Sequence, residues 1–446
     1  MNKISHVIKR SGAIVSFKKE RISNAIFRAA VAVGGRDKKA ADKLASEVIE
    51  ILNKKYTQGT NPHIEDIQDV VEKVLIKNGR SRIAKAYILY RNSNVQRRKE
   101  KALKASSPSK SIPWHKIWKI LDWSVSNNLH TIEAINKRVE NGEFPHIVHE
   151  SETAYTEEVT MAGELVSNRI DKLKIVLITG PSSSGKTTTT IRLEEHLTKL
   201  GFKFKMFAVD NYFYDLAMHP IDEFGDYDFE TPQALDLKLI NEHISRLCNG
   251  EEVTIPFYDF KTGTRFLDQT PMKLEKNEIL LIDSLHGLYP EMTKSIDDDQ
   301  KFKLYLEPMF QIKDNNGKYL RWTDFRLIRR MLRDSIHRAY DPVQTLEHWH
   351  YVRASEIRHI IPYLNSADYI INSAMPYELP IYKARLAKEF GKWTEKYKNN
   401  ELKKDAFIRA SRVNNFMQQI VGFSDESSIP QDSVIREFIG GSIHKY

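Results

Sequence analysis

The sequence has few of the features that mark secreted, membrane-spanning or thiol-dependent proteins. Its 446 residues include one cysteine, Cys248, which excludes an internal disulfide and a zinc site built from several thiolates. The longest apolar runs, such as "KIVLI" and "EILLI", are far shorter than the roughly 20 residues that a membrane-spanning helix needs. The first residues, "MNKISHVIKRSG", contain no apolar signal region. We therefore expect a soluble, cytoplasmic protein with no membrane partner.

The charge is unbalanced toward basic residues. A net charge of +9 is compatible with a nucleic-acid partner, but enzymes that bind polyphosphates also concentrate lysine and arginine. Much of the excess lies in residues 96–111, "QRRKEKALKASSPSKS", and in residues 326–338, "RLIRRMLRDSIHR". The first of these segments is typical of a solvated linker, so we place a domain boundary there. The length of the chain also favours more than one compact domain.

One motif predicts a phosphate-binding loop. Residues 180–187, "GPSSSGKT", satisfy the pattern G-x-x-x-x-G-K-[ST] between the apolar run "KIVLI" and a helical pattern. In such a loop the backbone N–H groups surround phosphate oxygens, the lysine reaches the outer phosphates, and the threonine hydroxyl ligates Mg²⁺. We therefore expect ATP to contact Gly180, Ser182, Ser183, Ser184, Gly185, Lys186, Thr187 and Thr188.

Four further apolar segments downstream repeat the strand pattern, separated by helical patterns. They run to Asp210, Asp283, Glu307 and Ser373. This alternation predicts a parallel α/β sheet in which the loops at the carboxyl ends of the strands carry function. Because Asp210 and Asp283 each end such a strand, both are candidates for holding Mg²⁺ or accepting a proton. From the residues alone, either carboxylate could hold Mg²⁺ together with Thr187.

The residues before the linker predict a small separate domain. "SHVIKRSGAIVSF" has apolar residues on both sides of a Ser11-Gly12 turn, which predicts a hairpin. "NPHIEDIQDVVEKVLIKNG" predicts a helix with Asn61 as its N-cap and with Asn78-Gly79 as its end. With "ERISNAI" and "AKAYILYR", these segments resemble the ATP-cone, a small regulatory nucleotide-binding domain, over about residues 3–95. The resemblance implies an adenine-nucleotide effector whose phosphates meet Lys9, Arg10 and Arg21.

Five ordered segments between Lys172 and Pro376 resemble the uridine kinase and phosphoribulokinase family. They are "VDNYFYD", "DFETPQALD", "IPFYDFKTGTR", "LLIDSLHGLY" and "DFRLIRRMLRD". The resemblance implies that the γ-phosphate of ATP is transferred to a hydroxyl group of a small molecule, with a general base and with a lid helix that carries arginines. The implied catalytic residues are Asp210, as the base, Lys186, Arg329 and Arg333, while Arg330 and Arg338 join the ATP-binding residues. The resemblance also implies that Thr187 and Asp283 hold Mg²⁺.

The sequence departs from this family where the acceptor binds. Members that bind uridine use an aspartate for the ribose diol and a histidine for the base, whereas this chain has Glu230 and Gly263 at those positions. We still expect a vicinal diol and favour a nucleoside acceptor, with modest discrimination between bases. The expected substrate-binding residues are Glu230, Tyr258, Arg265, Arg326 and Gln344. A non-nucleoside sugar or polyol stays open as the acceptor.

The expected fold class is α/β: a P-loop NTPase parallel sheet flanked by helices, with a small N-terminal α+β ATP-cone domain and a helical C-terminal tail. We expect the ATP-cone at 1–95, a linker at 96–112, a helical connector at 113–171, the kinase domain at 172–376 and a C-terminal extension at 377–446. A nucleotide-sensing P-loop regulator that binds nucleic acid is disfavoured, because Asp210 and the lid arginines are needed only for phosphoryl transfer. The implied cofactors are Mg²⁺ and ATP, and a homo-oligomer stays open.

Overall fold

The computed structural model describes residues 4–8, 14–35, 37–56, 60–91, 112–220, 227–337, 341–400 and 403–444. The chain divides into two compact units, residues 1–109 with 396–407 and residues 110–395 with 408–446. No helix in these described ranges combines the length and the apolar character that a membrane crossing requires.

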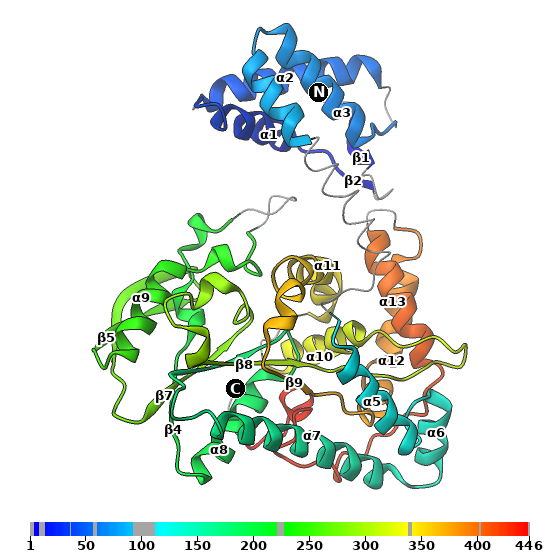
Figure 1. The fold of residues 1–446 in the computed structure, drawn as a ribbon. Coiled ribbons are helices and arrows are strands. Elements are labelled where there is room, and N and C mark those ends of the chain that lie inside the picture. The colour runs from blue at the N-terminus through cyan, green and yellow to red at the C-terminus, as the bar shows by residue number, and fades with distance from the viewer. Residues whose placement is uncertain are drawn as a thin grey trace. The chain divides into compact units, whose positions relative to one another are not determined.

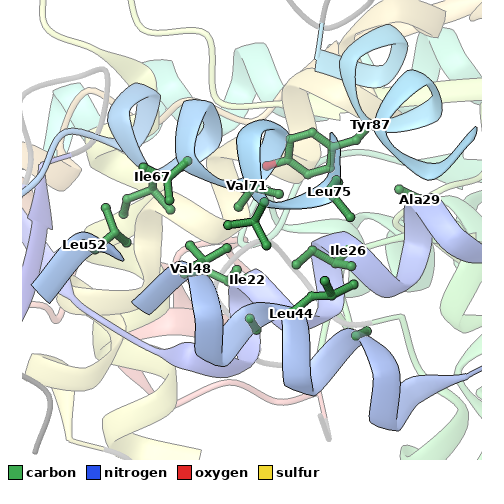
Figure 2. Close-up of a cluster of buried hydrophobic side chains, with 14 of the residues drawn as sticks. Ile22, Ile26, Ala29, Leu44, Val48, Leu52, Ile67, Val71, Leu75 and Tyr87 are labelled. Carbon is green, nitrogen blue, oxygen red and sulfur yellow. The ribbon is translucent and has the colours of Figure 1, made fainter. Parts of the chain in front are cut away.

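The first unit contains a two-stranded sheet and a group of helices. β1 (His6–Ile8) pairs antiparallel with β2 (Ile14–Ser16), which confirms the predicted hairpin. The helices are α1 (Lys19–Val31), α2 (Lys38–Lys55) and α3 (Ile64–Lys77), and residues 81–91 are also helical. Their apolar faces meet in one core (Figure 2), which includes Ile26, Val48, Val71, Leu75 and Tyr87.

α3 begins two residues later than the sequence predicts. The N-cap is His63, whose Nδ1 accepts a hydrogen bond from the Glu65 N–H at 3.3 Å, so the assignment of this role to Asn61 is wrong. The reason is a strand contact: the Ile8 N–H donates to the Pro62 carbonyl at 2.9 Å, and Ile8 forms a β-bridge with His63. Backbone that pairs with β1 stays extended, so the helix starts after it. The predicted end of the helix at residues 78–79 is confirmed.

The second unit is built on a five-stranded parallel sheet with the order β4-β7-β3-β8-β9 (Figure 1). The strands are β3 (Ile175–Thr179), β4 (Lys203–Met206), β7 (Glu278–Ser284), β8 (Lys301–Glu307) and β9 (Tyr369–Asn372). Each overlaps a segment that the sequence predicts as a strand, although β4 ends at Met206 and not at Asp210. The α/β class is confirmed. The central β3 is buried along its whole length, as a parallel sheet flanked by helices requires.

Two elements outside this sheet also contribute to the site. β5 (Val253–Asp259) and β6 (Thr264–Met272) form an antiparallel hairpin, and η1 (Val209–Tyr212) is a 3₁₀ turn that follows β4. The helices before the C-terminal region are α5 (Trp114–Ser126), α6 (Ile132–Glu140), α7 (Phe144–Ser167), α8 (Lys186–Lys199), α9 (Leu237–Cys248), α10 (Trp322–His337) and α11 (Pro342–His359). α7 packs against α8 and β9, and its Tyr155 hydroxyl lies 2.6 Å from Thr189 Oγ1. The helices of residues 113–171 thus belong to the same unit as the sheet.

The end of the chain returns to the second unit. α12 (Glu378–Tyr397) and α13 (Lys404–Met417) are followed by the short helix α14 (Arg436–Ile439). Arg412 on α13 donates to both carboxylate oxygens of Asp324 on α10, at 2.7 and 2.6 Å. α14 packs against α10 as well. Residues 408–444 therefore dock on the unit that carries the P-loop.

Candidate active site

The loop between β3 and α8 depends on both of its motif glycines. A side chain at Gly180 would place its Cβ 2.2 Å from the backbone oxygen of Leu306, and one at Gly185 would place its Cβ 2.3 Å from Val434 Cγ2. Gly185 also has a φ of +92°, a backbone conformation that residues other than glycine rarely adopt. The two glycines therefore allow the tight turn that leads the chain into α8.

Two serine hydroxyls of the loop are buried beside the start of this helix. Ser183 Oγ and Ser184 Oγ have no hydrogen-bond partner among the described residues. The Thr189 N–H donates to the Gly185 carbonyl at 3.1 Å, so the N–H groups before it in α8 point out of the helix end. Lys186 lies at the same end, with its Nζ 3.5 Å from the Pro181 carbonyl. Buried donors, outward N–H groups and a cation together suit the phosphates of ATP.

Asp283 stands beside the P-loop lysine. It lies on β7, opposite Ile178 of β3 in the sheet. Burial raises the pKa of Asp283 to about 6, Lys186 opposes this rise, and the nearby carboxylate of Asp210 adds to it. The Asp283 carboxyl is therefore ionised above about pH 6, and a bound cation would favour that form further. With the hydroxyl of Thr187, which is an exposed residue, it supplies oxygen ligands of the kind that Mg²⁺ prefers.

Asp210 does not end a strand, because β4 stops at Met206. Asp210 lies in η1 instead, and its side chain is exposed. Its neighbours anchor the turn. The rings of Phe207 and Tyr212 stack with their centroids 5.1 Å apart, and the Tyr212 hydroxyl lies 2.8 Å from His243 Nδ1. A fixed backbone thus presents an accessible carboxylate.

Two of the arginines on α10 that we predict to form a lid are fully buried. Arg326 pairs with Glu356, and Arg329 pairs with Glu378. Each guanidinium group also donates to a backbone carbonyl of the P-loop, at 3.0 Å from Arg326 and at 3.3 Å from Arg329. A buried ion pair is costly to break, because the remaining charge would be left without compensation. In this structure both side chains therefore hold the P-loop against α10.

Arg330 lies between the P-loop and the expected acceptor side. Its Nη1 is 3.2 Å from Ser182 Oγ and 3.1 Å from Glu230 Oε1. Arg333, one turn further along α10, lies 3.5 Å from Asp334. Glu230 and the P-loop thus share one guanidinium group.

Aromatic rings gather around Tyr258 on β5. The centroid of its ring lies 5.5 Å from that of Phe213, 4.9 Å from that of Phe260 and 6.3 Å from that of His219. His219 also lies 5.5 Å from Phe213 and 4.6 Å from Phe229. We call these five side chains the aromatic cluster. Phe229 and Phe260 are 40% and 61% exposed, so the cluster opens to solvent on one side.

The aromatic cluster contains two polar atoms that have no hydrogen-bond partner among the described residues, His219 Nδ1 and Tyr258 Oη, and both residues are buried. His219 Nε2 lies 2.8 Å from the Tyr214 carbonyl, which only accepts, so this nitrogen carries the proton and Nδ1 is an acceptor. Burial lowers the pKa of His219 and raises that of Tyr258, so both are neutral at pH 7. The cluster therefore offers an acceptor and a hydroxyl donor.

Gly263 is explained by its backbone. It lies between β5 and β6 with a φ of +68°, and its carbonyl accepts a hydrogen bond from the Leu216 N–H at 2.8 Å. A Cβ at this position would lie 2.8 Å from Leu216 Cβ. A histidine would be strained here, so any base-reading group of this chain has to come from another position.

The remaining predicted residues lie in several places. Arg265 lies on β6, opposite Tyr258 of the aromatic cluster, and pairs with Asp236 at 3.0 Å. Gln344 is exposed in the first turn of α11. Arg21 lies in the first turn of α1, where it is partly buried. Lys9, Arg10 and Arg338 lie outside the described residues.

Comparisons with known proteins agree with the two sets of motifs. Residues 5–95 match the ATP cone domain, and residues 175–379 match the phosphoribulokinase/uridine kinase family. This chain therefore contains an ATP-cone domain and a kinase domain of the phosphoribulokinase/uridine kinase family. Over 198 residues, it is 28% identical to a uridine kinase of Anoxybacillus flavithermus, which covers 44% of this chain and 84% of that one.

Two further proteins are similar to part of this chain. A uridine kinase of Mycoplasma genitalium is 31% identical over 160 residues, which are 36% of this chain and 66% of that protein. A solved structure described as a possible uridine kinase from Bacillus stearothermophilus covers 46% of this chain and 99% of that chain, with 18% identity and a TM-score of 0.31.

Sequence reasoning missed two residues that the fold brings to the candidate active site. His219 belongs to none of the motif segments, and it reaches Tyr258 because the segment after η1 folds against β5. Glu437 lies beyond the match to the kinase family, which ends at residue 379, yet its carboxylate contacts Thr188 of the P-loop helix. No spacing or periodicity in the sequence indicates either contact.

Proposed function

We propose that this kinase transfers the γ-phosphate of ATP to a hydroxyl group of a nucleoside, and that adenine nucleotide at the ATP-cone regulates the transfer. The observation that best supports this proposal is the pair of contacts that Arg330 makes. Arg330 joins Ser182 of the phosphate loop to Glu230, the carboxylate that we expect to hold the acceptor diol. Donor and acceptor sites that share one guanidinium group adjoin each other, as direct transfer requires.

In the proposed reaction, the side chains of this chain mainly position the reactants and neutralise charge. Asp210 accepts the proton of the attacking hydroxyl, and Lys186 with the N–H groups of α8 holds the phosphates. Thr187 and Asp283 would hold Mg²⁺, which neutralises phosphate charge when it is bound. Arg330 and Arg333 close over the transferred group, while Arg326 and Arg329 keep the P-loop in place.

The aromatic cluster favours a nucleoside over a sugar or polyol. The ring of Phe213 packs against those of Tyr258 and His219. A heteroaromatic base can stack on such a group of rings, which favours a nucleoside. The acceptor at His219 Nδ1 and the donor at the Tyr258 hydroxyl complement the donor and acceptor edge that a pyrimidine base presents. A polyol alone would leave the apolar ring surface uncovered.

A direct test is to incubate the protein with Mg-ATP and a panel of nucleosides, sugars and polyols. Phosphorylated products are then identified by mass spectrometry. We expect nucleosides to be the best acceptors. Phosphorylation of sugars or polyols without nucleoside phosphorylation would contradict the nucleoside proposal and would support the non-nucleoside alternative.

Replacing Tyr258 with phenylalanine should raise KM for the preferred nucleoside about tenfold, because one buried hydrogen bond to the base is lost. KM for ATP should stay unchanged, since the P-loop is untouched. Steady-state kinetics with each substrate varied in turn measures both constants. Tyr319→Phe is the matched control, because that ring is 48% exposed and lies outside the aromatic cluster. An unchanged nucleoside KM in Tyr258→Phe would remove the base-reading role.

The ATP-cone should provide a second adenine-nucleotide site on each chain. We expect calorimetry to give two bound nucleotides for the full chain and one for Lys186→Ala, with the remaining site lost when Lys9 and Arg10 are also replaced. Coupling between two sites is reciprocal and typically changes affinity by about 5- to 150-fold, so saturation of the cone should shift the ATP affinity of the kinase site. A single site in the full chain would refute the regulatory proposal and would leave the cone with another role.

A further inference from the structure

The C-terminal segment places a carboxylate on the P-loop helix. Glu437 Oε2 accepts a hydrogen bond from the Thr188 hydroxyl at 2.9 Å and another from the Thr188 N–H at 3.4 Å. This N–H belongs to the first turn of α8, where the backbone donors are expected to hold nucleotide phosphate. Glu437 is buried, with 3% of its surface exposed. An internal anion therefore sits on a donor pair that the proposed nucleotide site needs.

The surrounding segment is packed so as to keep the carboxylate there. Ser433 Oγ lies 2.9 Å from the Tyr377 hydroxyl, and the Arg329 guanidinium lies over the Phe438 ring at 5.0 Å. Val434 approaches the P-loop so closely that a Cβ on Gly185 would meet it at 2.3 Å. Residues 433–439 thus contact both the loop and the lid helix α10, whose arginine they cover.

We propose that residues 433–439 form an intrasteric inhibitory segment, in which Glu437 occupies a phosphate position of the nucleotide site and is displaced when ATP binds. The proposal rests on nucleotide binding at the P-loop but not on the identity of the acceptor. Two anions cannot share the Thr188 N–H, because they would repel each other at short range and compete for one donor. The apparent affinity for nucleotide is then reduced by the fraction of molecules in which the segment is docked.

Glu437→Gln tests this proposal with the least change of shape. The variant keeps a hydrogen-bond acceptor but removes the charge, which weakens the contact with Thr188. We expect it to bind Mg-ADP about tenfold more tightly than the wild type. Glu389→Gln is the matched control, because it removes a glutamate charge from an exposed ion pair with Lys392 on α12. Calorimetry on the full chain measures the affinity without an acceptor.

Hydrogen exchange on the wild-type protein gives a second readout that needs no variant. The N–H groups of Phe438 and Ile439 both donate to the Ile435 carbonyl, so exchange reports whether the segment is folded. We expect saturating Mg-ADP to accelerate exchange in residues 433–439. Unchanged or slower exchange, or equal or weaker Mg-ADP binding by Glu437→Gln, would overturn the inference.

The Lys186→Ala variant separates this inference from the proposed function. The calorimetric signal that disappears in Lys186→Ala belongs to the P-loop, so the comparison of Glu437→Gln with the wild type is made on that signal. If this signal exists but does not respond to Glu437→Gln, the inhibitory role of the segment fails and the kinase site stands. If no nucleotide signal depends on Lys186, both proposals fail.

Discussion

Replacing Asp210 with asparagine is expected to lower the turnover number by roughly 10²-fold or more, which is the usual contribution of a general base. Asparagine has the same shape as aspartate, but it cannot accept the proton of the attacking hydroxyl. Because Phe207 and Tyr212 anchor η1, the turn should keep its position in the variant. ATP affinity should therefore stay nearly unchanged, and the loss should lie in the transfer step.

The measurement for Asp210→Asn is a pair of titrations, one of initial rates against acceptor and ATP and one of nucleotide binding. Asp122→Asn serves as the control, because it makes the same chemical change on an exposed residue of α5. Wild-type turnover in Asp210→Asn would exclude Asp210 as the base. A large loss of nucleotide binding would instead indicate that Asp210 acts mainly through the metal or the P-loop.

Replacing Lys186 with alanine is expected to weaken nucleotide binding and also to lower kcat/KM by roughly 10²-fold or more, as loss of a preorganised phosphate-binding cation does. The cation faces the outer phosphates in the ground state and in the transition state, so both constants should change. Removing the cation should also raise the pKa of Asp283 above about 6, because Lys186 opposes the effect of burial on that carboxyl.

Lys199→Ala is the matched control for Lys186→Ala, because Lys199 is exposed at the opposite end of the same helix. Nucleotide binding by calorimetry and initial rates of phosphoryl transfer measure the two effects separately. Transfer and binding at wild-type levels in Lys186→Ala would mean that the P-loop motif does not hold the donor.

The sequence by itself determined the elements whose signals are local. Gly180, Gly185 and Lys186 are close together in one motif, and the strands β3 and β7 coincide with the apolar runs "KIVLI" and "EILLI". Such patterns depend on backbone geometry within a few residues, so they can be recognised without a fold. The α/β class and, in the first unit, the hairpin and the helix α3 followed from them, and the ordered motifs carried the resemblance to both families. The start of α3 did not, because a contact with β1 decides it.

Only the tertiary structure decided what the side chains around the P-loop contact. Arg326, Arg329 and Arg330 belong to the same predicted lid motif. The first two form ion pairs with the buried carboxylates of Glu356 and Glu378, whereas Arg330 pairs with Glu230. Glu437 is 249 residues away from Thr188 along the chain, a separation over which no local pattern carries information. The physical reason is that ion pairing and burial depend on which surfaces pack together in the folded protein. The spacing of residues along the chain does not specify these long-range contacts.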